Sequence, residues 1–307
     1  MSEHRVEAVI LTYRPDERFA EAVRRLERQD YPLERIHVIN TVSGIFPEEI
    51  EKMPGISVTH IRPEEFDHGG TRDMGFALSE AEILVFMTQD ALPANTKMIG
   101  ELVKPLLDSD KVGVSYARQL PAEDCDEIER YTRSFNYPGK SKVKDMSDLP
   151  VMGIKTFFCS DVCAAYRRSI YQEMGGFTKR TIFNEDMIMA AKMVKAGYKV
   201  AYTAEARVIH SHNYSGWQQF QRNFDLAVSQ ADHPEIFAGI RSESEGIRLV
   251  KNTAGYLIRR KRRRLIPALL YKSGCKYLGY KAGRSYRRMP LWLVKRCSAS
   301  VKYWQKP

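Results

Sequence analysis

Residues 83–90 read Ile83-Leu84-Val85-Phe86-Met87-Thr88-Gln89-Asp90, an apolar run that ends in polar and acidic residues. Five consecutive large apolar side chains are typical of a strand that is buried on both faces. The polar residues that follow predict that this strand ends at the edge of a sheet. A lone Asp after a strand is also typical of a helix or turn cap, so the role of Asp90 depends on the rest of the chain.

Strand and helix patterns alternate on both sides of this run. Strand patterns cover residues 6–11, 35–39 and 112–116 and begin at 55, and helical spacing covers 16–29, 70–79 and 95–107. This alternation predicts an α/β fold, with a mostly parallel sheet flanked by helices. Ligands of such sheets bind at the carboxyl ends of the strands, where Thr12-Tyr13, Asn40-Thr41 and Gln89-Asp90 fall.

The second half continues with a helical pattern over 185–195, strands near 199–202 and 207–209, and a helix over 215–230. Residues 136–153 are polar, lysine-rich and carry prolines, which predicts a mobile surface loop. Two motifs in this half can carry chemistry, Asn184-Glu185-Asp186 at a helix start and His210-Ser211-His212 after a strand. The acids also suit a helix N-terminus, and a lone His is usually structural, so each motif has an ordinary structural alternative.

Together, Asp90, Asp186 and the two histidines match what a divalent-metal enzyme acting on a diphosphate needs. A carboxylate and an imidazole can hold Mg²⁺ or Mn²⁺, and another carboxylate can move a proton. Phe66-Asp67-His68-Gly69-Gly70-Thr71-Arg72 adds a glycine-containing loop that enters a helix. Its amides and Arg72 could contact phosphates, although a Gly-Gly turn is weak evidence by itself.

The order of these segments resembles family 2 glycosyltransferases with the GT-A fold, over roughly residues 5–230. The matching segments are Ile10-Leu11-Thr12-Tyr13-Arg14-Pro15, Val38-Ile39-Asn40-Thr41-Val42-Ser43, His68-Gly69-Gly70-Thr71-Arg72, Thr88-Gln89-Asp90-Ala91, Gly175-Gly176-Phe177, Asn184-Glu185-Asp186 and His210-Ser211-His212-Asn213-Tyr214-Ser215. The third, fourth and last of these are most similar to bacterial rhamnosyltransferases. Each segment is weak alone, and their joint order is specific.

The resemblance implies roles for individual residues. Asp186, with Glu185 beside it, would be the catalytic base. Asp90 and His210 would bind the metal, with His212 as the alternative ligand. The residues implied to border the nucleotide sugar are Thr12, Tyr13, Arg14, Asn40, His68, Gly69, Arg72, Gln89 and Asp90. Two departures matter: Asn40 stands where the family usually has an Asp, and Gln89-Asp90 replaces an Asp-x-Asp motif.

Charge is distributed very unevenly along the chain. The net charge is +10, yet residues 251–307 hold 17 of the 48 Lys and Arg and no Asp or Glu. The first 250 residues therefore hold the other 31, together with all 38 acidic residues. Basic residues interleaved with Trp, Tyr and Leu suit an anionic membrane surface, which we favour over nucleic acid and over a merely solvated extension.

Five cysteines without a Cys-x-x-Cys pair predict reduced thiols in a cytosolic protein. We expect no signal peptide and no membrane-spanning segment, because neither apolar pattern is present. The chain is thus predicted to be cytoplasmic and peripheral on the inner face of the cell membrane. We expect a glycosyltransferase domain over 1–240, with a nucleotide part at about 1–120 and an acceptor and catalytic part at about 121–240. A basic amphipathic helical region is expected over 241–307.

The sequence therefore predicts an inverting, metal-dependent glycosyltransferase of cell-surface polysaccharide synthesis. The resemblance implies dTDP-rhamnose as the donor, with a UDP-sugar as the alternative, and a glycan or lipid-linked acceptor. A metal-dependent nucleotidyl- or phosphotransferase would use similar carboxylates. The non-enzymatic alternative is a nucleic-acid-binding protein that acts through its basic tail.

Overall fold

The computed structural model describes residues 4–240 and 243–305, and its packing divides the chain into two compact units. We call them the sheet unit and the helical unit and describe each by itself. The sheet unit consists of Met1–Ala122, Tyr137–Lys179 and Glu185–His210, and the helical unit of Glu123–Asn136, Arg180–Asn184 and Ser211–Pro307. The predicted division near residue 240 concerns function and stays a prediction.

The sheet unit is built on one mixed sheet, with strand order β3-β2-β1-β4-β8-β6-β9-β5 and with β7 paired to β9. Strands β1 to β4, β6 and β9 run in one direction, and β5, β7 and β8 run in the other. This confirms the predicted α/β class with a mostly parallel sheet. The strands are β1 (Val6–Tyr13), β2 (Ile36–Thr41), β3 (Ile56–Ile61), β4 (Ile83–Thr88), β5 (Leu92–Pro93), β6 (Val112–Leu120), β7 (Lys142–Lys144), β8 (Cys163–Arg167) and β9 (Lys199–Ile209).

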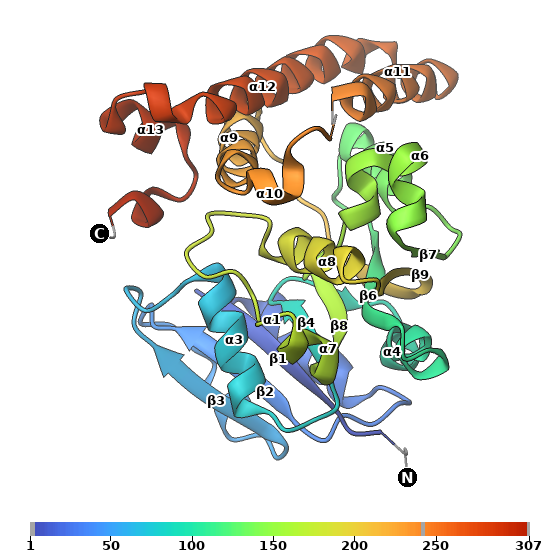
Figure 1. The fold of residues 1–307 in the computed structure, drawn as a ribbon, viewed down its shortest axis with the longest axis vertical. Helices are drawn as coiled ribbons and strands as arrows, with labels where there is room; N and C mark the ends of the chain where they lie inside the picture. Colours follow the sequence, from blue (N-terminus) through green and yellow to red (C-terminus); the bar gives the residue numbers. More distant parts are fainter. Residues whose placement is uncertain (1–3, 241–242, 306–307) are drawn as a thin grey trace. The chain divides into compact units, whose positions relative to one another are not determined.

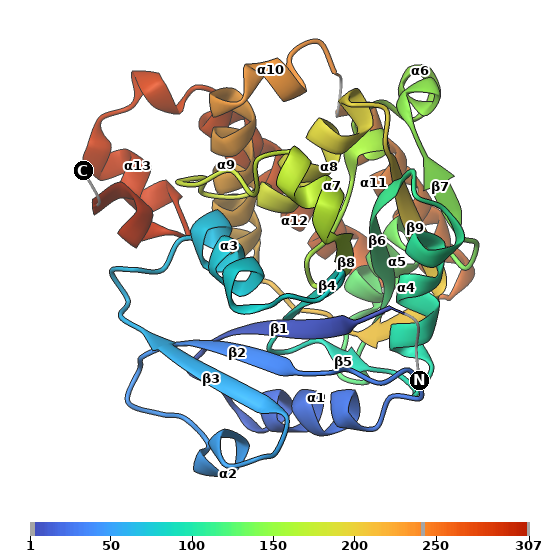
Figure 2. The same ribbon diagram turned by 60° about the horizontal axis from the view of Figure 1, so that its bottom comes forward.

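Helices cover both faces of this sheet, because its strands are apolar on both faces. Ala8 and Ile10 of β1 belong to the same buried cluster as Phe19 and Met98. Val9 points the other way, 2.9 Å from where a Cβ on Gly75 would lie. Figure 2 shows α1 and α3 on opposite sides of β1, β2 and β3. The helices of this unit are α1 (Glu17–Glu27), α2 (Glu48–Glu51), α3 (His68–Leu78), α4 (Met98–Asp108), α6 (Leu149–Met152), α7 (Arg168–Glu173) and α8 (Glu185–Lys195).

The carboxyl ends of the parallel strands lie together at one edge of the sheet. The parallel strands β1, β2, β4, β6 and β9 all finish there. Strand β8 runs the other way between β4 and β6, with Met87 paired to Cys163. The residues that precede β8 therefore enter the sheet at the same edge where Asp90 leaves it.

Two local predictions differ from the structure. Segment 136–153 was expected to be a mobile loop, but it contains β7, the 3₁₀ helix η1 (Met146–Asp148) and α6. Lys144 explains the difference, since its buried Nζ donates to the carbonyl oxygens of Lys155 at 3.0 Å and Phe158 at 2.5 Å. In addition, the two short strands expected after Gly197 form the single strand β9.

The helical unit contains the predicted C-terminal helices (Figure 1, orange to red). Its core includes Phe224 and Val228 of α9 and Val294 of α13. Helix α12 packs closely on α9, because a Cβ on Gly279 would lie 2.2 Å from the Phe220 carbonyl oxygen. Its helices are α5 (Glu127–Asn136), α9 (Gly216–Asp232), α10 (Pro234–Phe237), α11 (Glu243–Arg259), α12 (Ile266–Arg284) and α13 (Leu291–Cys297).

Two parts of the predicted 241–307 region, residues 241–242 and 306–307, lie outside the described residues. Among the residues that the structure describes, no helix combines the length and the apolar character that a bilayer crossing requires.

Candidate active site

Gln89 joins the ends of the two central parallel strands. Its Oε1 accepts from the Tyr13 amide at 2.8 Å and from the Thr12 hydroxyl, and its Nε2 donates to the Tyr13 carbonyl oxygen at 3.1 Å. The amide side chain thus adds hydrogen bonds to β1 beyond Leu11 and Thr88, the last pair that β1 forms with β4. This geometry favours a role for Gln89 in positioning the loop after β1.

The residues predicted to border the nucleobase differ in how they are exposed. Tyr13 is 43% exposed. Arg14 is exposed as well, with its guanidinium carbon 5.3 Å from the centre of the Tyr13 ring. Thr12 and Asn40 are buried, and the Asn40 amide lies 2.9 Å from His60 Nδ1. Tyr13 and Arg14 are therefore the accessible members of this set.

Asp90 and His210 come together at the ends of β4 and β9. His210 Nε2 lies 3.5 Å from Asp90 Oδ2, and His210 Nδ1 lies 3.0 Å from Gln119 Oε1. Because the Gln119 amide nitrogen donates to the Tyr137 hydroxyl at 2.7 Å and to Ser160 Oγ at 3.0 Å, its oxygen is the acceptor that faces the imidazole. A neutral His210 then carries its hydrogen on Nδ1 and presents the lone pair of Nε2 toward Asp90.

This donor set fits the expected cation. A carboxylate oxygen and an imidazole nitrogen suit Mn²⁺ and, less typically, Mg²⁺. Within the sheet unit, Asp90 and His210 both offer ligand atoms of the kinds that metal ions bind. His212 belongs to the helical unit, and its part in the site stays a prediction.

The loop before α3 positions Arg72. Asp67 caps the helix by accepting from the Gly70 amide at 2.7 Å. Gly69 has no room for a side chain, because a Cβ there would lie 2.1 Å from the Thr178 carbonyl oxygen. The first turn of α3 is thereby held against the 175–179 segment, and Arg72 follows one turn later as a buried residue.

Arg72 is the centre of a cluster of acids. Its Nε lies 2.8 Å from Asp161 Oδ2, and its Nη1 lies 2.9 Å from Glu185 Oε1. His68, more exposed, lies 3.7 Å from the same Glu185 oxygen. The guanidinium is therefore committed to two carboxylates, which favours a role inside the cluster over direct contact with phosphate.

Asp186 stands beside this ion-pair group and is only partly buried. Its Oδ2 accepts from the Asp161 amide at 3.1 Å and its Oδ1 from the Met187 amide at 2.7 Å. Burial, with the negative charges of Glu185 and Asp161, raises the pKa of Asp186 well above its ordinary value. At Glu185, burial acts to raise the pKa of the carboxyl. The charge of Arg72 outweighs burial and holds that pKa below its ordinary value.

Asp161 and Gln119 are two residues of the site that the sequence pattern did not reveal. The segment before β8 connects both groups of side chains: Ser160 accepts from Gln119, Asp161 pairs with Arg72, and the Val162 carbonyl accepts from the Thr88 amide at 3.2 Å. A signal for Asp161 was present, since a single acid in the mostly apolar run 157–166 must find a partner when it is buried. Gln119 had no such signal.

The structure thus groups the predicted residues in three sets. Arg72 pairs with Asp161 and Glu185, Asp186 accepts from the Asp161 amide, and His68 lies beyond Glu185. Asp90 meets His210. Gln89 contacts Thr12 and Tyr13. Asn40 is in none of these sets and is paired with His60, and Gly69 packs against Thr178.

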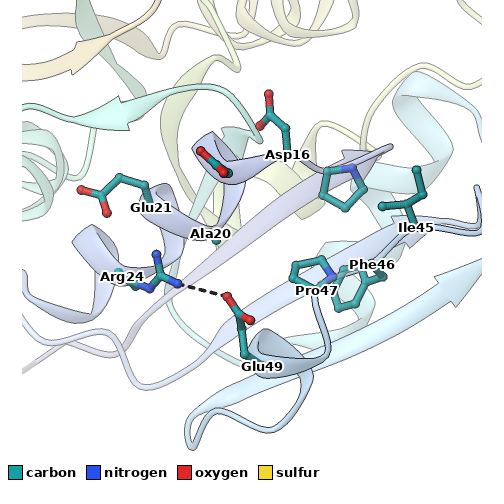
Figure 3. A pocket seen from close by; sticks show the side chains of 10 residues that line it. Asp16, Ala20, Glu21, Arg24, Ile45, Phe46, Pro47 and Glu49 are labelled. Atoms are coloured by element: carbon teal, nitrogen blue, oxygen red, sulfur yellow. Dashed lines mark hydrogen bonds and ion pairs between the residues drawn. The ribbon is translucent and has the colours of Figure 1, made fainter.

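A surface pocket of about 660 Å³ lies beside the loop after β1 (Figure 3). Arg24 and Glu49 form an ion pair across it at 3.1 Å. Its rim is mainly acidic, which disfavours a diphosphate, and none of the predicted site residues lines it. The pocket is lined by Pro15, Asp16, Glu17, Ala20, Glu21, Arg24, Ile45, Phe46, Pro47 and Glu49.

Comparison with known proteins relates this arrangement to characterised relatives. The chain is 38% identical to the O-antigen chain rhamnosyltransferase RfbN of Salmonella typhimurium, covering 98% of this chain and 96% of the relative. It is 42% identical over 248 residues to the O-antigen chain rhamnosyltransferase WbaN of Salmonella anatum, covering 80% and 78% of the two chains.

Solved structures share the fold at low identity. The mannosyltransferase PcManGT from Pyrobaculum calidifontis, in complex with GDP-Man and Mn²⁺, matches with a TM-score of 0.59 at 17% identity, covering 100% of this chain and 89% of that one. GalNAc-T7 with UDP, GalNAc and Mn²⁺ matches with a TM-score of 0.55 at 14% identity, covering 81% and 54%. These matches confirm the predicted GT-A architecture. The profile of glycosyl transferase family 2 matches residues 7–175, and the chain belongs to this family of glycosyltransferases.

Proposed function

We propose that this glycosyltransferase moves a sugar from a nucleoside diphosphate to an acceptor hydroxyl with inversion, using Asp186 as the base. The observation that carries the proposal is the environment of Asp186. Its carboxylate is partly exposed, has a raised pKa and lies at the ligand-binding edge of the sheet. The pair Asp90 and His210 ends strands at the same edge.

In the proposed reaction, Asp186 takes the proton of the acceptor hydroxyl. The acceptor oxygen forms a bond to the anomeric carbon from the face opposite the diphosphate. The bond from that carbon to the phosphate oxygen breaks, and its electron pair leaves with the nucleoside diphosphate. The carboxyl proton is then released to solvent, so atoms and charge balance.

Asp90 and His210 are the residues that we propose to hold a divalent cation, Mg²⁺ or Mn²⁺, with His212 as the alternative to His210. A bound cation would stabilise negative charge on the leaving diphosphate. Gln119 keeps the His210 ring in the orientation that binding needs. Manganese in two solved relatives of the same fold supports this proposal.

The proposed donor is dTDP-rhamnose, with a UDP-sugar as the alternative, and the acceptor is a glycan or lipid-linked glycan of a cell-surface polysaccharide. The names of both Salmonella relatives support rhamnose and O-antigen synthesis. We propose that Tyr13, Arg14 and the Gln89-Asp90 turn border the donor, with Thr12 and Asn40 behind them. His68, Gly69 and Arg72 shape the wall that continues to the base.

The test is a transfer assay with purified protein, a glycan acceptor and either dTDP-rhamnose or a UDP-sugar. We expect a glycoside together with free nucleoside diphosphate, and loss of turnover in EDTA that added Mn²⁺ or Mg²⁺ restores. Release of pyrophosphate instead would favour the nucleotidyltransferase alternative. Activity that EDTA leaves unchanged would refute the metal proposal.

We also propose that the basic C-terminal region docks on anionic lipid and places the enzyme on the cytoplasmic face of the membrane. Arg259–Arg264 are exposed. Helix α12 exposes Leu270, Tyr271, Tyr277 and Leu278, which are spaced to share one face, and Trp292 is 68% exposed. Each cation near such a surface contributes about 1 kcal/mol to binding. In this proposal residues 1–120 bind nucleotide, 121–240 bind acceptor and catalyse, and 241–307 bind lipid.

Flotation with vesicles that contain phosphatidylglycerol tests the docking proposal. Replacing Arg259, Arg260, Arg262 and Arg263 by Gln should abolish flotation in moderate salt, while transfer to a soluble acceptor persists. A matched control replaces the exposed Lys52 and Lys104 of the sheet unit by Gln and should float normally. Flotation that survives the arginine substitutions would refute the assignment, and tail-dependent capture of RNA without flotation would favour nucleic acid.

A further inference from the structure

The Arg72 cluster contains more negative than positive charge. Asp161, Glu185 and Asp186 are three carboxylates, and Arg72 is the one buried cation among them. Within the described residues, Arg72 forms its ion pairs with Asp161 and Glu185, and no cation lies within 4.0 Å of the Asp186 carboxylate. The candidate base is therefore the one acid of the three that Arg72 does not neutralise directly.

Asp161 contacts Arg72 through its carboxylate and Asp186 through its backbone amide. Its Oδ1 accepts from the Tyr166 hydroxyl at 2.6 Å and its Oδ2 pairs with Arg72. Its backbone amide donates to Asp186 Oδ2 at 3.1 Å. The carboxylate thus occupies the guanidinium, while the amide of the same residue fixes the direction of the base.

We propose that Asp161 is a positioning residue that keeps Asp186 basic by occupying Arg72 and orients it through its own amide. This inference rests on the proposed role of Asp186 as the base. Without the negative charge of Asp161, the guanidinium would interact more strongly with Asp186, and a carboxylate beside an unoccupied cation is a weaker base.

The electrostatics of the cluster agree with this arrangement. Burial raises the pKa of Asp161 to about 6, against the lowering effect of Arg72. The pKa of Asp186 is raised by burial and then by Glu185 and Asp161. The charged and titratable groups around the pair are Arg72 of α3, Glu185 of α8, Cys159 before β8, Tyr166 of β8, and His68 beyond Glu185.

Asp161→Asn tests the proposal, since it keeps the size and the backbone amide but removes the charge. We expect the acid limb of the kcat/KM profile to move to lower pH by about 1–3 units, the shift that a nearby unlike charge causes. We also expect maximal turnover to fall at least tenfold, because a weaker base takes the proton less readily. A purely structural Asp161 would lower turnover without moving the limb, and that result would overturn the proposal.

Arg72→Gln provides a test of opposite sign. Removing the guanidinium leaves three carboxylates without their cation, so the acid limb should move to higher pH. A shift in the same direction as in Asp161→Asn would overturn the proposal. This variant also keeps the proposal testable if Asp161→Asn does not fold. The matched control is Asp108→Asn, which removes one exposed carboxylate of the sheet unit and should leave the profile unchanged.

A measurement without turnover separates this inference from the proposed function. The carboxyl ¹³C signal of Asp186, assigned by its loss in Asp186→Asn, reports the titration of that residue directly. We expect it to titrate at lower pH in Asp161→Asn than in the unchanged protein. If the titration shifts but Asp186→Asn still transfers sugar, the proposed base is wrong and the electrostatic coupling stands. If the titration does not shift, the coupling is wrong.

Discussion

The Arg72 cluster and the Asp90–His210 pair lie at the same edge of one sheet and are built in opposite ways. In the cluster, the acids are paired with protein groups. The carboxylates of Asp161 and Glu185 form ion pairs with the Arg72 guanidinium, and Asp186 accepts hydrogen bonds from two backbone amides. In the pair, a carboxylate oxygen and an imidazole nitrogen face each other at 3.5 Å. The first arrangement tunes a proton affinity, and the second offers ligand atoms.

At this edge of the sheet, burial alone does not identify the function of a residue. Asp161 is 2% exposed and acts on a neighbour, whereas the Asp90 side chain is 26% exposed and can meet a ligand directly. The short segment before β8 serves both, through Ser160 toward Gln119 and through Asp161 toward Asp186. Substitutions on the two sides should therefore have separable effects.

The largest effect is expected for Asp186→Asn. Loss of the base should reduce kcat by about 10²–10⁴-fold, the usual contribution of a positioned general base. Mn²⁺ affinity should be unchanged, because Asp186 belongs to the cluster and not to the pair. Steady-state kinetics with a Mn²⁺ titration of the same preparation checks both, and a parallel loss of metal binding would erase the distinction between the two groups.

The same variant should become more stable relative to the parent protein as the pH rises. The raised pKa of Asp186 means that the folded protein holds this proton more tightly than the unfolded chain. That contribution is full below the unfolded pKa, about 3.9 for Asp, and is lost as the pH rises through the folded-state value. Asn does not titrate, so the Tm of Asp186→Asn relative to the parent should increase from pH 5 to pH 8. A constant difference would contradict the raised pKa.

The next effect belongs to the pair. Asp90→Ala and His210→Ala should each weaken Mn²⁺ binding by more than about 100-fold, the upper range for outer partners of a metal ligand. Electron paramagnetic resonance of unbound Mn²⁺, with dTDP present, measures this directly. The control is Asp110→Asn, whose side chain is 99% exposed. Affinities within twofold of the control would exclude these two residues as ligands.

The sequence anticipated the parts of this comparison that depend on local pattern. The buried run 83–87 predicted β4 and placed Asp90 at its end, and Glu185–Lys195 is helical as predicted. Hydrophobic periodicity and the rule for parallel strands suffice for such predictions. The pairing of Asp90 with His210 was implied by the resemblance to family 2 glycosyltransferases, and in the structure β4 and β9 end at the same edge.

What the sequence did not reveal depends on long-range pairing. Asp161 reaches the edge only because β8 runs antiparallel between β4 and β6, and no local signal gives the direction of that strand. Arg72 was expected near phosphate, and only the structure shows both carboxylates on it. Lys144 likewise orders a segment that looked mobile, through acceptors more than ten residues away.

The smallest effect is expected for a substitution of Gln119, which also tests most directly whether the pair and the cluster are separate. Gln119→Leu keeps the volume of the buried side chain but removes the oxygen that accepts from His210 Nδ1. The ring then loses the partner that fixes its tautomer and orientation, and Mn²⁺ binding should weaken by about 10–100-fold, less than in His210→Ala. The acid limb of kcat/KM, measured at saturating Mn²⁺, should stay in place, because the substitution leaves every charge of the Arg72 cluster unchanged and Gln119 contacts Ser160, the neighbour of Asp161. If the limb moved as far as in Asp161→Asn, the pair and the cluster would be one coupled site rather than two.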